Sequence, residues 1–92
     1  MTMKPEHAAQ FVTVALERRD PERVLRVLRQ IAHARGMAKV AAASGIGRTK
    51  LYKMLAPGAV PRFDAVLKIA RALGVDFMAQ PAATEQNTRV LT

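Results

Sequence analysis

A group of polar side chains between residues 48 and 53 has the types and the spacing for contact with a nucleic acid. The group consists of Arg48, Thr49, Lys50, Tyr52 and Lys53. An arginine in the first turn of a protruding helix donates to guanine O6 and N7 as a fork, and a threonine methyl packs on thymine. For Arg48 a base contact stands against a phosphate contact or a solvated side chain, and for Thr49 a base contact stands against an uninvolved helix surface. We expect Lys50 to contact phosphate, and Lys53 to meet either a base or a phosphate. Tyr52 is expected to place its hydroxyl on phosphate or to pack its ring.

Two short helices joined by a tight turn are needed to hold these side chains outward, and residues 37–55 have that pattern. Ala41 is small enough for the second helix to cross closely over the first. Gly45 permits the positive φ of a sharp turn between helices. Ile46 fills the space between the helices, and Leu51 anchors the second helix to the core. The spacing is typical of a DNA-binding helix-turn-helix.

Helical periodicity recurs along most of the chain. It predicts five helices, over about Glu6–Arg19, Pro21–Arg35, Ala38–Ser44, Arg48–Leu55 and Arg62–Leu73. Asp20 and Pro21 mark the start of the second helix, because an aspartate accepts from free amides and proline suits the first position. Gly36 and Gly74 are predicted to close the second and last helices.

The periodicity also predicts which side chains face the core. In the first helix they are His7, Phe11, Val14 and Ala15. In the second they are Val24, Val27, Leu28 and Ile31. In the last they are Phe63, Val66, Leu67, Ala70 and Leu73. Ile69 falls outside this last stripe, and with Val75 and Phe77 it is expected to form an exposed apolar patch for self-association.

These elements indicate an all-α fold. We expect a compact five-helix, lambda-repressor-like helix-turn-helix domain over residues 1–78, with its DNA-binding motif at 37–55. From Ala79 onward the composition becomes small and polar, which predicts a flexible tail over residues 79–92.

Positive charge is concentrated around the motif. The net charge is +8, and no acidic residue occurs between Glu22 and Asp64. This acid-free window holds the cations Arg23, Arg26, Arg29, Arg35, Lys39, Arg48, Lys50, Lys53 and Arg62. Such a field attracts a polyanion such as double-stranded DNA, although a merely solvated basic surface is the alternative. Lys39 and Arg62, each near a helix start, are further candidates for phosphate contacts.

Several classes of protein do not fit the composition. Cysteine is absent, which excludes disulfides and thiolate metal sites, and His7 and His33 are too few for a metal site. We find no nucleophile–base arrangement, carboxylate pair or phosphate loop, so we expect no enzyme, cofactor or metal. The apolar run at residues 11–16 is too short to span a membrane, and a cytoplasmic protein is expected.

A further set of short motifs lies between residues 34 and 75. The set consists of Arg35-Gly36-Met37, Ala41, Gly45, Arg48, Leu51-Tyr52-Lys53, Pro61-Arg62-Phe63, Val66-Leu67-Lys68 and Ala72-Leu73-Gly74. In these positions the chain resembles the HigA-like, Xre-type helix-turn-helix antidote proteins of bacterial addiction modules. The resemblance implies a protein that neutralises a small toxin and represses its own operon. The chain departs from the family pattern at Gly47, where the family usually has serine.

A homodimer is expected on a palindromic operator, because two-fold symmetry in the protein matches two half-sites on one face of DNA. Two other functions fit the sequence. One is a stand-alone or phage-type repressor with no toxin partner, which the neighbouring gene would distinguish. The other is a protein-interaction module that has lost DNA binding, against which the acid-free window argues.

Overall fold

The computed structural model describes residues 4–81. It contains five helices, α1 (Pro5–Glu17), α2 (Pro21–Arg35), α3 (Met37–Ser44), α4 (Arg48–Met54) and α5 (Phe63–Ala72). Residues 4–81 include no strand. The prediction of an all-α fold with five helices is confirmed, and each bound lies within two residues of the expected one.

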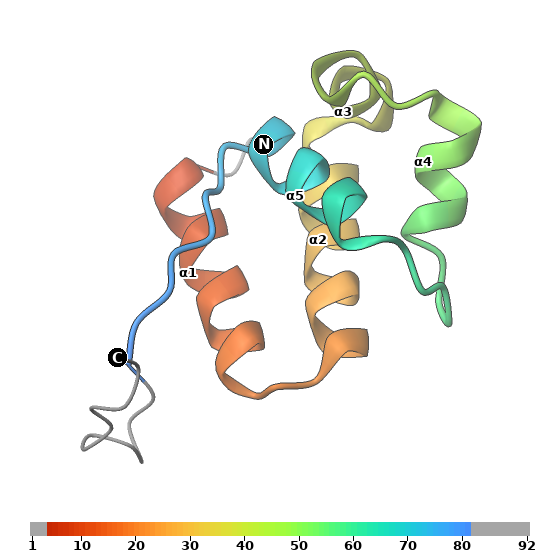
Figure 1. The fold of residues 1–92 in the computed structure, drawn as a ribbon. Helices are drawn as coiled ribbons and strands as arrows, with labels where there is room; N and C mark the ends of the chain where they lie inside the picture. Colours follow the sequence, from red (N-terminus) through yellow and green to blue (C-terminus); the bar gives the residue numbers. More distant parts are fainter. Residues whose placement is uncertain (1–3, 82–92) are drawn as a thin grey trace.

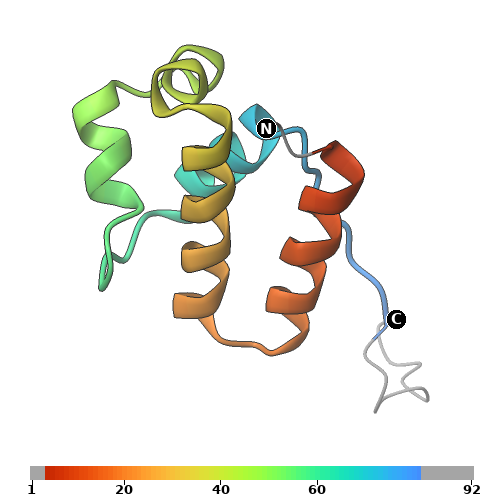
Figure 2. The ribbon, with the colours of Figure 1, turned by 180° about the vertical axis from the view of Figure 1, so that it is seen from behind.

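The helices α1 and α2 run antiparallel, side by side, and are joined by a short turn (Figures 1 and 2). The turn ends at Asp20, whose Oδ1 accepts a hydrogen bond of 3.1 Å from the Glu22 amide, and Pro21 is the first residue of α2. The predicted start of α2 is therefore confirmed. The pair forms one side of the molecule, and α4 lies on the other side (Figures 1 and 2).

The core lies where α2, α3, α4 and α5 meet, and α3 packs against the other three. Its largest fully buried side chains include Leu28, Ile31, Leu51, Leu55, Ile69 and Leu73. Since two of these come from α4 or the residue that ends it, α4 is anchored from one face only. None of the helices within residues 4–81 is long and apolar enough to span a bilayer.

The predicted inner faces of α1 and α5 are partly wrong. In α1 the buried side chains are Ala8, Val12 and Ala15, whereas Phe11 and Val14 are about half exposed. Small residues line this face, which allows α1 to approach α2 closely. In α5 the most buried positions are Ala65, Ile69 and Ala70, while Phe63 and Leu67 are exposed.

Because a different face of α5 points to the core, the predicted self-association patch is also wrong. Ile69 is 0% exposed and Val75 is 3% exposed, so both belong to the core, and Phe77 is half-buried. The Val75 amide donates to the Ala70 carbonyl at 2.9 Å, and the amide of Gly74 (φ +80°) donates to Arg71 at 2.9 Å. This is the Schellman arrangement at a helix end, which folds the next apolar residue back onto the helix.

The expected C-terminal tail lies mostly outside the described residues. Residues 79–81 are exposed and have no regular secondary structure. The remainder, residues 82–92, is not described.

Candidate nucleic-acid interface

The turn between α3 and α4 is held by local hydrogen bonds. Gly45 is left-handed (φ +76°, ψ +9°), and its amide donates to the Ala41 carbonyl at 3.0 Å, as predicted for this position. The Ser44 hydroxyl donates to Ala41 and accepts from the Ile46 amide, both at 3.2 Å. Ile46 is 9% exposed, which confirms that it fills the space between the two helices. The turn therefore fixes the direction in which α4 leaves α3.

The helix α4 has one buried face and one outward face. Leu51 is fully buried, and Thr49 and Lys53 lie one turn apart on the opposite side of the helix. Arg48 and Lys50 flank them, and all four of these polar side chains are exposed. Four of the predicted contact residues are thereby placed on one accessible surface. Whether they touch DNA remains a prediction.

Tyr52 lies at the edge of that surface and is 44% exposed. Its ring meets His33 of α2 edge-on, with ring centroids 6.0 Å apart and the planes at 60°. The ring therefore packs against α2, and the hydroxyl's predicted phosphate contact is untested.

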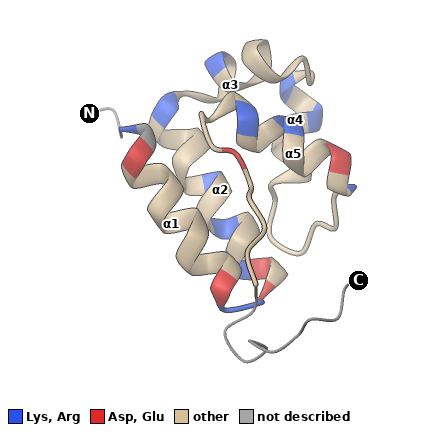
Figure 3. Cartoon of the chain, turned by 60° about the vertical axis from the view of Figure 1, so that its left-hand side comes forward, with Lys and Arg blue, Asp and Glu red and all other residues tan. Residues whose placement is uncertain are grey.

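The cations of the acid-free window fall into two groups. Arg23, Arg29 and Arg35, all on α2, are partly buried. The exposed group consists of Arg26, Lys39, Arg48, Lys50, Lys53 and Arg62. Lysine and arginine are the only charged residues on α3 and α4. The acidic residues of the described part of the chain lie on α1, at the α1–α2 turn and the start of α2, on α5 and on the segment after it (Figure 3). Four of the six exposed cations of the acid-free window therefore lie on the two helices that flank the turn.

Arg29 has a specific partner that sequence reasoning missed. Its Nη1 donates to the main-chain carbonyl of Leu55 at 2.7 Å, across 26 residues of sequence. Leu55 is the residue that ends α4. No local signal in the sequence indicates this contact, because it depends on how α2 and α4 pack.

Two carboxylates hold the loop between α4 and α5. Glu22 Oε2 accepts from the Gly58 amide at 3.0 Å, and Asp64 Oδ1 lies 3.3 Å from Arg62 Nε in an exposed ion pair. Arg62, a predicted phosphate contact, is therefore already paired with a carboxylate. Lys39 lies in the first turn of α3 and is exposed.

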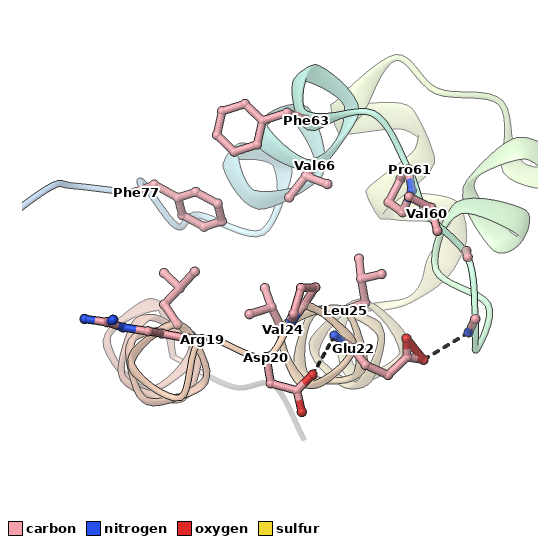
Figure 4. A pocket seen from close by; sticks show the side chains of 14 residues that line it. Arg19, Asp20, Glu22, Val24, Leu25, Val60, Pro61, Phe63, Val66 and Phe77 are labelled. Carbon is pink, nitrogen blue, oxygen red and sulfur yellow. Dashed lines mark hydrogen bonds between the residues drawn. The ribbon is translucent and has the colours of Figure 1, made fainter.

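A groove of about 470 Å³ opens between the α1–α2 turn, the loop after α4, α5 and the segment that follows it. Figure 4 shows Phe63 and Val66 of α5, with Phe77, facing Val24 and Leu25 of α2. The lining is mainly apolar, and none of the predicted contact residues belongs to it. No group of three or more metal-ligating side chains occurs within residues 4–81.

Comparison with known proteins identifies a family. The family model of the probable addiction module antidote proteins matches residues 3–81. An uncharacterized protein from Haemophilus influenzae strain Rd is 36% identical over 70 residues, which cover 76% of this chain and 72% of that relative. No solved structure matches the chain significantly.

Proposed function

The chain belongs to the family of probable addiction module antidote proteins, and on that premise we propose that it is an antitoxin that binds operator DNA through α4 and represses its own operon. Its domain would act as a lambda-repressor-like helix-turn-helix of the HigA and Xre type. The partner neutralised by the protein would be the small toxin encoded beside it.

The observation that carries the DNA-binding half is the two-sided character of α4. Leu51 fastens the helix to the core, the opposite face presents Thr49 and Lys53 to solvent, and exposed Arg48 lies at the flank of that face. A helix with this surface has the dimensions and the donors to enter a major groove. The absence of acidic residues from α3 and α4 removes the repulsion that phosphates would otherwise meet.

The side chains divide into two roles. Arg48 donates to guanine, and Thr49 packs its methyl on thymine, so these two select sequence. Lys39 and Lys50 contact phosphate, and Lys53 meets either a base or a phosphate. Arg62 adds less attraction than the other cations, because Asp64 partly neutralises it. Two copies related by a two-fold axis would read the half-sites of a palindrome.

A gel-shift series on the promoter of the protein's own operon tests the DNA-binding half. Arg48→Ala is expected to relax the preference at one or two base pairs by about 1–3 kcal/mol, because the guanine fork is lost. Lys50→Ala is the matched variant, since it also removes one exposed cation from the first turn of α4. It should weaken binding to every duplex alike and lower the salt slope by about one. Equal affinity of the wild-type protein for operator and random duplex would defeat the proposal.

The antitoxin half is tested by coexpression with the neighbouring gene. We expect the two products to purify together, and the neighbour to be toxic when it is expressed alone. A harmless neighbour that does not bind this chain would favour a stand-alone repressor, and it would leave the DNA-binding result unaffected.

A further inference from the structure

We infer that Arg29 is a positioning residue, which sets the orientation of α4 and so the preference for the operator, and that it does not contact phosphate. The inference rests on the proposed DNA-binding function. It separates Arg29 from the exposed cations of the acid-free window, with which its charge alone would group it.

The hydrogen bond from Arg29 to Leu55 has the properties of a side-chain cap at the C-terminal end of α4. The last carbonyls of a helix have no partner within the helix, and that end carries partial negative charge. Arg29 supplies both a donor and a positive charge there, at a Nη1–O distance of 2.7 Å to the Leu55 carbonyl. Hydrogen bonds from a charged donor are typically this short and are stronger than neutral ones. The contact is partly buried, so water competes for it less than at an exposed site.

The opposite end of α4 is held by the turn and by buried Ile46, and it has no side-chain cap. Its N-cap is Gly47, which has no side chain to accept from the free amides. Arg48 and Thr49 are in this first turn, about 10 Å along the axis from the end that Arg29 holds. A shift of the C-terminal end of α4 therefore tilts the helix and, with it, the side chains proposed to read bases. The hydrogen bonds of those side chains tolerate little change in distance or angle.

The hydrogen bond to Leu55 also gives the positive charge of Arg29 a role within the fold. A guanidinium that donates to Leu55 from a partly buried position on α2 has fewer donors free for a phosphate oxygen than Arg26 has. Arg26 lies one turn earlier on the same helix and is exposed. The two arginines thus offer a matched pair. Either substitution removes one positive charge, and only the substitution of Arg29 also removes a contact with the end of α4.

The test compares Arg29→Met with Arg26→Met in the full chain. Affinities for the operator and for a random duplex of equal length are measured over a series of salt concentrations, well below the unfolding midpoint of each variant. Arg29→Met should lower the ratio of operator to random affinity about tenfold, on the scale of one charge-assisted hydrogen bond, and leave the salt slope unchanged. Arg26→Met should leave that ratio unchanged.

Two further measurements separate positioning from a loss of folded protein. Arg29→Lys, which keeps a charged donor, should restore part of the ratio. Amide chemical shifts of residues 48–55 in DNA-free protein should move in Arg29→Met and not in Arg26→Met. The inference is overturned if Arg29→Met weakens both duplexes equally and lowers the salt slope by about one, or if it changes nothing. A wild-type protein without operator preference would instead overturn the proposed function, from which this inference starts.

Discussion

The two glycines that flank Ile46 differ in what the backbone demands of them. Gly45 has φ +76°, a conformation that L side chains rarely adopt, although its position has open space around it. Gly47 has φ −58° and ψ 147°, an ordinary backbone conformation, and a Cβ there would meet no heavy atom within 4 Å. Gly45 is therefore needed for its backbone, whereas Gly47 only leaves the start of α4 uncapped.

The same substitution at the two sites should have opposite effects. Gly47→Ser should raise the free energy of unfolding by a few tenths of a kcal/mol, because a serine hydroxyl caps the free amides of α4. Gly45→Ser should lower it by about 1–2 kcal/mol through strain in the left-handed region. Urea unfolding followed by circular dichroism measures both. A similar fall in the free energy of unfolding in both variants would show that the backbone at position 47 also requires glycine.

At the scale of elements, the loop from α4 to α5 is tied down by the residues that border the acid-free window. Glu22 accepts from the Gly58 amide, and Asp64 pairs with Arg62. The Glu22 contact limits how far the loop moves relative to α2, whereas the Arg62–Asp64 pair is local to the start of α5. Both contacts are exposed, so they order the loop more than they stabilise the whole fold.

Replacing Glu22 should loosen this loop. In Glu22→Ala the Gly58 amide loses its acceptor, and its hydrogen exchange should become several-fold faster, while the free energy of unfolding falls by less than about 1 kcal/mol. Glu17→Ala is the control, because Glu17 is an exposed acidic residue at the end of α1. Unchanged exchange at Gly58 in Glu22→Ala would contradict a role for this contact in solution.

Local signals predicted the elements well and the packing less well. The caps at Asp20, Gly45 and Gly74 are set by neighbouring residues, so the sequence alone locates them. The predicted inner face of α5 was partly wrong because Phe63 is apolar yet exposed, while Ile69 is fully buried. Periodicity does not distinguish two adjacent apolar stripes when both are present. The hydrogen bond from Arg29 to Leu55 depends on how α2 and α4 pack, and no sequence pattern predicts it.

At the scale of the molecule, charge is distributed unevenly. The helices α3 and α4 carry only positive charges, and the acidic positions lie elsewhere on the described chain (Figure 3). A polyanion would therefore be drawn to the end of the protein that bears α4. Because Ile69 and Val75 are buried, the proposed two-fold dimer must use a different surface from the predicted patch.

The dimer proposal predicts a strict half-site spacing. Recognition helices of a two-fold dimer lie about 34–36 Å apart, one turn of DNA. Inserting about half a turn between the operator half-sites should lower the affinity to that of a single half-site, because the second helix then faces the wrong side of the duplex. Full affinity for the altered operator would show that the protomers bind independently.

The ring contact between α4 and α2 has a practical consequence. Tyr52 is the one tyrosine in a chain without tryptophan, and its ring lies against His33. Its ultraviolet emission therefore originates at the edge of the helix proposed to read DNA. The fluorescence of the unlabelled protein thus reports whether α4 stays packed against α2, both in the free protein and after a duplex is added.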